Sequence, residues 1–219
     1  MEYEVKLNDG ERLEPLDDKH YIIQSENGYR FGSDAVDLAK FAARYATEKS
    51  RVVDMCSGSG IIGILLSIEK GCTVDGVELD DALYDMSVRS ARFNGLNGVA
   101  FYNADVKRIE DILAPAAYDV VVCNPPFYKA ESRPSKVAPN ANSELTVALG
   151  DIVRAAKYVL KVGGSLCMVH TATRMDEVLS VYREYGLTPK ELVINKNCKT
   201  FLLRAVRGGK DGLTVNILE

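Results

Sequence analysis

Short runs of β-branched residues alternate with longer segments of helical spacing along this chain of 219 residues. Segments between the first five runs, at 61–70, 81–94, 106–113 and 145–161, have apolar residues at helical spacing. The alternation predicts an α/β fold with a mainly parallel sheet. The seven predicted strands are 51–55, 72–78, 99–104, 118–123, 165–170, 191–195 and 200–206.

Both ends of the chain depart from this alternation. The last two strands are separated by only four residues, 196–199, so we expect them to pair as an antiparallel hairpin that completes a seven-stranded sheet. Ahead of the first strand, 33–46 reads as a helix capped by Ser33 or Asp34, after an acidic, irregular segment at 1–19. The length suits a single domain, 1–219, with an N-terminal extension at 1–50 and a core at 51–219.

Composition narrows the class of protein. A hydrophobic content of 47% supports one well-buried core, and a net charge of −4 argues against nucleic-acid binding through overall charge, although a local basic patch stays compatible with it. No apolar run is long enough to span a bilayer and no signal peptide is recognisable, so we expect a cytoplasmic protein with no membrane partner. The cysteines are odd in number and form no C-x-x-C pair, which predicts reduced thiols and no metal site: Cys56, Cys72, Cys123, Cys167 and Cys198.

The first chemical signal is a glycine-rich turn between a strand and a helix, VVDMCSGSGIIG at 52–63. Gly58, Gly60 and Gly63 match G-x-G-x-x-G, in which glycine permits positive φ and a close approach of the backbone to a ligand. Glu78 ends the next strand, 18 residues after Gly60, where a carboxylate can accept both hydroxyls of a ribose. The pattern indicates a nucleotide-like ligand; the alternative is a tight turn followed by a surface glutamate.

The second signal is CNPPFYK at 123–129, in which two prolines end an apolar strand. Proline cannot donate to a ladder and fixes its own φ, so the chain after the strand becomes a rigid set of acceptors. The side-chain oxygen of Asn124 and the carbonyl of Pro125 are placed to accept from one planar amino group, with Pro126 holding the turn and Phe127 and Tyr128 stacking on a base. Orienting an amine requires no strong base, which suits a chain whose two histidines lie outside both motifs. The alternative is a plain turn.

Both motifs resemble those of known enzymes. The order Asp54, Gly58, Gly60 is similar to motif I of class I S-adenosylmethionine methyltransferases, D-x-G-x-G-x-G, with Cys56 where glycine is usual. N-P-P-F is the motif of amino methyltransferases that act on adenine in DNA or RNA, or on glutamine in proteins. The resemblance implies a Rossmann-like fold, S-adenosyl-L-methionine as cofactor, and Asp54 near the methionine end of that cofactor. It also implies Asp105 near the adenine, although Asp105 reads equally as a helix N-cap.

A wider resemblance covers most of the chain from about residue 21. Segments 21–42, 155–190 and 200–209 are similar to the bacterial tRNA1(Val) adenine-N6 methyltransferase family, which modifies adenine 37 beside the anticodon. The resemblance implies an RNA adenine-N6 methyltransferase with a tRNA partner, and the sequence favours a monomer. It departs from the family at 131–144. The resemblance places four residues of this chain beside the cofactor: Gln24, Phe31, Ser33 and Asp34. The alternative is that these residues only form a capped helix with a buried aromatic side chain.

Basic residues suggest how a nucleic acid would bind. We expect them to form a phosphate track, meaning a set of basic side chains that contacts the phosphates of the nucleic acid. The alternative is a charged surface that only contacts solvent. Its members are Lys129, Arg133, Lys136, Lys196, Lys199, Arg204, Arg207 and Lys210. Two other functions stay open: a protein glutamine methyltransferase, which usually brings a separate N-terminal domain, and a dinucleotide-dependent or purely binding module, which leaves Asn124 unexplained. Methylation of adenine in ribosomal RNA or DNA is a further alternative.

Overall fold

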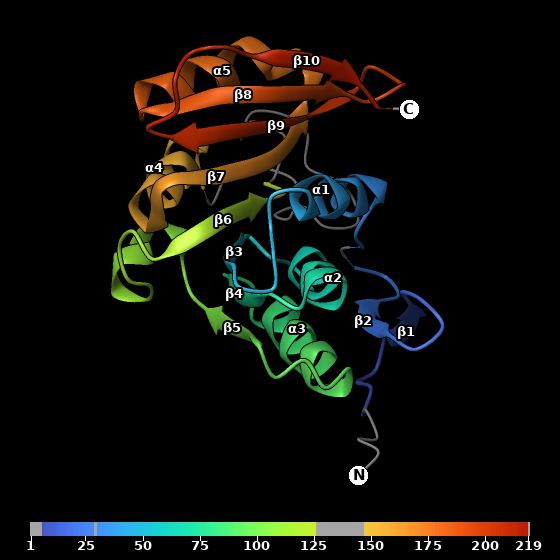
Figure 1. The fold of residues 1–219 in the computed structure, drawn as a ribbon. Helices are drawn as coiled ribbons and strands as arrows, with labels where there is room; N and C mark the ends of the chain where they lie inside the picture. The colour runs from blue at the N-terminus through green and yellow to red at the C-terminus, as the bar shows by residue number, and fades with distance from the viewer. Residues whose placement is uncertain (1–5, 29, 126–146, 219) are drawn as a thin grey trace.

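The computed structural model describes residues 6–28, 30–125 and 147–218, and its centre is an eight-stranded sheet in the order β10-β8-β9-β7-β6-β3-β4-β5. Figure 1 shows helices on both faces of this sheet. The five strands from β3 to β7 are parallel to one another, while β9 is antiparallel to both β7 and β8. The strands are β3 (Arg51–Met55), β4 (Thr73–Glu78), β5 (Val99–Asn103), β6 (Tyr118–Cys123), β7 (Leu160–Thr171), β8 (Leu187–Ile194), β9 (Thr200–Arg207) and β10 (Thr214–Ile217).

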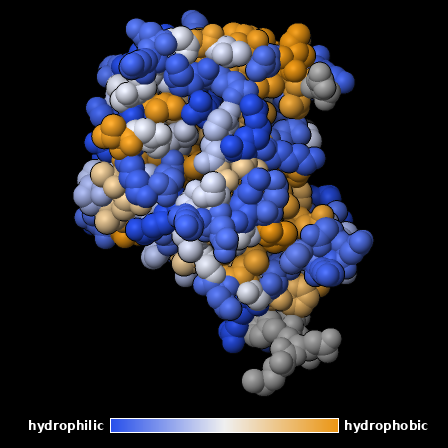
Figure 2. All heavy atoms as spheres, viewed as in Figure 1, coloured by the Kyte–Doolittle hydropathy of each residue, from blue (hydrophilic) through white to orange (hydrophobic). Residues whose placement is uncertain are grey.

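The predicted fold class and C-terminal hairpin are confirmed, but the strand count is wrong. All seven expected strands are present, and β10 adds an eighth by pairing parallel to β8 at the edge of the sheet. Val215 and Ile217 of this edge strand are 57% and 70% exposed. Figure 2 shows orange side chains near the top of the view, over these C-terminal strands. A short exposed run at the end of the chain carries no alternation of buried and exposed positions that would reveal it as a strand.

Helices cover the two faces of the sheet with two separate apolar clusters. On one face, Val53, Val121 and Cys123 pack with residues of α4 and α5; on the other, Val52 and Val122 pack with α1 and α2. Strands with both faces covered read as continuous apolar runs, which explains the sequence of β6. The helices are α1 (Ser33–Ala43), α2 (Ile61–Lys70), α3 (Asp81–Phe93), η1 (Val106–Asp111), α4 (Leu149–Val159), η2 (Ala172–Arg174) and α5 (Met175–Glu184).

Several details of the predicted helices are wrong. The N-cap of α1 is Gly32 rather than Ser33 or Asp34, and glycine has no side chain with which to cap the helix. Residues 106–111 form a 3-10 helix rather than an α-helix. The sequence analysis placed no helix between 170 and 191, where the structure has α5. Within the described residues, no helix is both long enough and apolar enough to cross a membrane.

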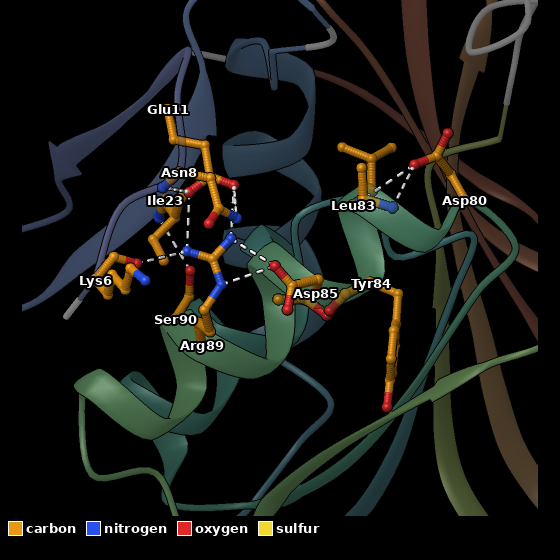
Figure 3. A network of polar contacts seen from close by, with 12 residues as sticks. Lys6, Asn8, Glu11, Ile23, Asp80, Leu83, Tyr84, Asp85, Arg89 and Ser90 are labelled. Carbon is orange, nitrogen blue, oxygen red and sulfur yellow. Dashed lines mark hydrogen bonds and ion pairs between the residues drawn. The ribbon is translucent and has the colours of Figure 1, made fainter.

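The N-terminal segment is also more regular than expected, since β1 (Glu11–Pro15) and β2 (Tyr21–Ser25) form an antiparallel hairpin. Figure 3 shows the guanidinium of Arg89, on α3, between Glu11 and Asp85. Its nitrogens donate to the two Glu11 oxygens at 2.9 and 2.6 Å and to Asp85 at 2.8 Å. The Ile23 amide donates to the Ser90 hydroxyl at 3.0 Å. A bidentate, charge-assisted pair therefore holds the hairpin on α3.

The strand register determines which chain segments lie at the carboxyl ends of the parallel strands. We call this side of the sheet the functional edge. Met55 pairs with both Val77 and Cys123, so β3, β4 and β6 end together at their carboxyl ends. Thr200 pairs with Thr171, so the loop between β8 and β9 lies at the same edge. Parallel sheets bind ligands at this edge.

Candidate functional site

The glycine turn after β3 has the left-handed backbone that the sequence predicts. Cys56, Gly58 and Gly60 have φ of 54°, 57° and 84°. A Cβ on Gly60 would lie 2.5 Å from the Phe101 ring, and one on Gly63 would lie 2.8 Å from Val74. The glycines thus allow α2 to begin directly against the sheet. Cys56 does take a left-handed conformation, at the modest cost that a non-glycine residue incurs there.

Asp54 is the second-last residue of β3, and its carboxylate is entirely shielded from water. Its Oδ2 accepts from the Gly63 amide at 2.8 Å, and its Oδ1 has no hydrogen-bond partner among the residues that the structure describes. Burial raises the pKa of Asp54 to about 8; the Gly63 hydrogen bond opposes this shift and the charge of Glu78 adds to it. The turn therefore holds one unsatisfied acceptor, which a ligand with a donor or a positive charge would satisfy.

Glu78 connects the end of β4 to the same turn. Its Oε2 accepts from the Gly58 amide at 2.7 Å and its Oε1 from the Asp80 amide at 2.9 Å. Burial raises the pKa of Glu78, although both amide hydrogen bonds favour the charged form. The predicted acid and the predicted glycine turn are therefore in direct contact.

Ser57 is a residue of this turn that the sequence analysis did not select. Its side chain is buried, with 4% of the residue exposed, and within the described part of the chain its hydroxyl has no hydrogen-bond partner. A buried hydroxyl without a partner is uncommon. Its position between Cys56 and Gly58 is the signal that could have identified it.

The second motif begins beside this turn. Cys123 is the last residue of β6 and pairs with Met55, so Asn124 follows β6 where the glycine turn follows β3. Asn124 is half-buried and Pro125 is buried. The remaining predicted residues of this region lie outside the described part of the chain: Pro126, Phe127, Tyr128, Lys129, Arg133, Lys136 and the departing segment 131–144.

Asp105 and Phe31 have structural contacts of their own. The Asp105 carboxylate accepts from the Lys107 amide at 2.9 Å and caps η1, which confirms the N-cap alternative. It follows β5 at the same sheet edge as Glu78, since Glu78 pairs with Asn103. Phe31 is half-buried against the cluster around α1, and its amide donates to the Gln24 carboxamide at 3.3 Å.

Asp34 lies at the start of α1, next to the exposed Ser33, and is tied to the β8–β9 hairpin. Its Oδ1 accepts from the Thr200 hydroxyl at 3.0 Å and from the side-chain Nδ2 of Asn195 at 3.3 Å. The sequence analysis missed Asn195 and Thr200, because neither belongs to a motif. These contacts fix the amino end of α1 at the functional edge.

Among the described residues, the predicted phosphate track is wrong for Arg204, Arg207 and Lys210. Arg204 lies 4.2 Å from the centre of the Tyr45 ring and donates to Ser165, and Arg207 donates to the Leu160 carbonyl. Arg207 ends β9 at the opposite edge of the sheet, with Lys210 beyond it. Lys196 and Lys199 are exposed at the functional edge, and neither has an acidic partner among the described residues.

This arrangement defines a Rossmann-like methyltransferase fold, and the family comparison agrees. Residues 23–183 match the model of the Methyltransferase small domain family, so the chain belongs to that family. It is 28% identical over 192 residues to the tRNA1(Val) (adenine(37)-N6)-methyltransferase of Aeromonas hydrophila, covering 82% of this chain and 77% of that protein.

Two further relatives indicate the breadth of the family. The ribosomal protein L11 methyltransferase of Campylobacter jejuni (serotype O:23/36) is 36% identical over 85 residues, which cover 39% of this chain and 28% of that protein. The crystal structure of a ribosomal protein L11 methylase from Lactobacillus delbrueckii superimposes with a TM-score of 0.64 at 16% identity, covering 81% of each chain. The second likeness establishes the fold alone.

Proposed function

We propose that this chain transfers a methyl group from S-adenosyl-L-methionine to the N6 amine of an adenine in RNA, with adenine 37 of tRNA1(Val) as the target. The observation that carries the proposal is the placement of Asn124 and Pro125 next to the glycine turn. The relative from Aeromonas hydrophila supports the same reaction over most of the chain.

The residues of the glycine turn fit the proposed cofactor. S-adenosyl-L-methionine supplies a methyl group activated on a sulfonium. Asp54 Oδ1 and the Ser57 hydroxyl are buried polar atoms for which residues 6–28, 30–125 and 147–218 supply no partner, and a bound amino acid moiety would satisfy both. Glu78 would accept from the ribose hydroxyls, with Cys56, Gly58 and Gly60 contributing backbone. Four more residues are proposed as cofactor contacts. Asp105 would lie near the adenine, and the others lie at the start of α1: Phe31, Ser33 and Asp34.

On the acceptor side, Asn124 and Pro125 would act on the amine. The Asn124 side-chain oxygen and the Pro125 carbonyl each accept one hydrogen of the N6 amine, which aims the nitrogen at the methyl group. After transfer the nitrogen loses a proton to water without a strong base. The state of His170 is consistent with this. Burial and the charge of Arg174 lower the pKa of His170 to about 4. Pro126 and Phe127 complete the proposed motif, and Tyr128 contacts the base.

Positive side chains would hold the RNA backbone. Lys199 lies at the functional edge with its ammonium exposed, and Lys129 and Arg133 follow the catalytic motif in the sequence. A phosphate contact of this kind gives affinity without sequence preference. The target adenine would leave its loop to reach Asn124.

A protein substrate is the second candidate. The local similarity to a ribosomal protein L11 methyltransferase favours it, but that match spans only 39% of this chain. Glutamine shares a planar amino group with adenine, so Asn124 would serve both substrates. Adenine in ribosomal RNA or in DNA presents the same group.

The test is a labelling reaction. Purified protein would be incubated with methyl-labelled S-adenosyl-L-methionine and total tRNA from a strain that lacks the enzyme, and the RNA digested to nucleosides. We expect labelled N6-methyladenosine, and a loss of turnover of about 100-fold or more in Asn124→Ala. Cofactor affinity should stay within about twofold, because Asn124 acts on the acceptor.

Equal losses of turnover and cofactor affinity in Asn124→Ala would refute the assigned role. Absence of label from tRNA would refute the proposed substrate. Parallel reactions with ribosomal RNA, DNA and a glutamine-containing ribosomal protein would then identify the acceptor.

A further inference from the structure

Two cysteine thiols lie together where the glycine turn and the catalytic motif meet. Cys56 follows β3, and Cys123 is the last residue of β6 and pairs with Met55. Cys123 belongs to the cluster beneath α4 and α5, and Cys56 packs against that cluster, so both side chains lie on the same face of the sheet. A side-chain hydrogen bond joins the Cys56 and Cys123 thiols, so the two sulfurs lie within hydrogen-bond reach; after burial, this bond is the next largest cause of the raised pKa of Cys123.

The backbone separation suits a covalent bond between them. Neighbouring strands lie about 4.8 Å apart and each residue advances about 3.3 Å. Two alpha carbons on adjacent strands, one residue out of register, are therefore roughly 6 Å apart. Disulfides span alpha-carbon separations of about 4.4 to 6.8 Å.

The two thiols differ in access. Cys56 is partly exposed, whereas Cys123 has no exposed surface. Cys72 and Cys167 belong to the apolar cluster on the opposite face of the sheet, and Cys198 is exposed in the β8–β9 loop. Cys56 is thus the thiol that a small oxidant in the site would meet first.

We propose that Cys56 and Cys123 form a reversible disulfide when a hydroperoxide enters the site, and that this bond stops methyl transfer. The Cys56 sulfur first attacks the peroxide, which yields a sulfenic acid and one molecule of alcohol or water. The Cys123 sulfur then attacks the sulfenic sulfur and displaces its hydroxyl. That hydroxyl leaves as water with the Cys123 proton, and two thiols have been oxidised by one peroxide. An external thiol reverses the bond by exchange.

Burial sets the pace of the second step. It raises the pKa of Cys123 well above its usual value, with added contributions from Cys56 and from the charges of Asp54 and Glu78. Little thiolate is available there, so closure of the disulfide is slow, on the order of minutes to hours.

The consequence for activity rests on the proposed function. A disulfide holds its sulfurs about 2.05 Å apart, closer than two thiols in contact. Closure would therefore draw the glycine turn towards the residue that precedes Asn124. A displacement of about 1 Å in such a site costs roughly 100-fold in rate.

The experiment measures the bond separately from the activity. Wild type, Cys56→Gly and Cys198→Ser would each be treated with hydrogen peroxide, digested without reduction and examined by mass spectrometry, and each compared with its own untreated sample. We expect a 56–123 cross-linked peptide in wild type and in Cys198→Ser, none in Cys56→Gly, and reversal by dithiothreitol. Cys56→Gly is a mild variant, because glycine adopts the left-handed conformation freely.

Methyl transfer would be followed on the same samples. Wild type should lose about 10-fold or more of its activity and regain it with dithiothreitol, while Cys56→Gly keeps its own untreated activity. Absence of the cross-link, or its formation without loss of activity, would overturn the proposal. If tRNA is not the substrate, the cross-linked peptide still appears. S-adenosylhomocysteine should slow its formation, and an unchanged rate would count against the cofactor placement alone.

Discussion

The glycine turn at 56–60 and the β8–β9 turn at 195–199 lie at one edge of the sheet and contrast in their surroundings. Each holds a cysteine with left-handed backbone, φ 54° at Cys56 and φ 55° at Cys198. Residues 57–60 are buried, and no described residue is a hydrogen-bond partner of the Ser57 hydroxyl among them. Residues 196–199 are exposed and carry two ammonium groups.

The contrast teaches that one edge can use two kinds of recognition. A buried turn recognises a ligand by its shape and through polar groups already removed from water, so an added atom strongly destabilises the packing. An exposed turn acts through charge, which tolerates changes of shape but depends on salt. Substitutions in the two turns should therefore fail in different ways.

The largest effect is expected for Gly60→Ala. The new methyl would meet the Phe101 ring at 2.5 Å and Ser87 at 3.0 Å, at a φ of +84°. The Phe101 ring also packs closely against Gly76, where a Cβ would lie 2.2 Å from it. We expect a loss of about 3 kcal/mol or more in the free energy of unfolding, measured in denaturant.

Gly10→Ala is the matched control. Its φ is +77°, yet a Cβ there would meet nothing within 4 Å. It should show only the backbone strain, about 1 to 2 kcal/mol. Equal losses in the two variants would mean that close packing at Gly60 contributes nothing.

Asp54→Asn should change how stability depends on pH. The pKa of Asp54 is raised from 3.8 to about 8 in the folded state, so between those values the folded chain binds more protons than the unfolded chain. The free energy of unfolding of the wild type should therefore fall as pH rises through this window, by up to about 1.4 kcal/mol per pH unit. Asparagine removes this contribution.

The difference between the two unfolding curves isolates Asp54. His170 has a pKa lowered from 6.5 to about 4, which gives an opposite slope below about pH 6.5. Wild type and Asp54→Asn share that contribution, so the difference between their curves removes it. Parallel curves for wild type and Asp54→Asn would show that the carboxyl is already ionised in the folded state.

The smallest effect is expected for Lys196→Gln with Lys199→Gln. If both ammonium groups contact phosphates, their removal should weaken RNA binding roughly 10-fold at low salt. The slope of log affinity against log salt concentration should shrink by about 1.5. The control pair is Lys49→Gln with Lys210→Gln, which makes the same charge change at the opposite edge. Equal losses from the two pairs would show that only net charge matters.

The sequence predicted those parts of the fold and site whose signals are local. The β3 strand, the glycine turn and α2 are contiguous, and glycine is required there by backbone conformation and by Phe101. Asn124 was likewise recognisable beside the end of an apolar strand. The positions of Asp54 and Glu78 at this edge follow from parallel strand order alone.

Contacts between distant residues account for most of what the sequence did not reveal. The β1 strand has a charged sequence, ERLEP, and its Glu11 is buried only because Arg89 lies 78 residues further along. The segment of β10 is only four residues long and exposed at every position, so its brief alternation of polar and apolar residues is too short to identify a strand. Helix α5 does have an amphipathic sequence, with Val178 and Tyr182 fully buried, and was simply not recognised.

The contact of Asp34 with Asn195 and Thr200 has a consequence for the order of folding. It joins residues 161 and 166 positions apart in the chain. A ribosome releases the first helix long before the last hairpin exists, and contacts of such long sequence separation form late. The glycine turn can therefore form during synthesis, whereas the β8–β9 turn at the same edge forms only after the final strands have been made. Truncated or stalled chains would thus hold half a site.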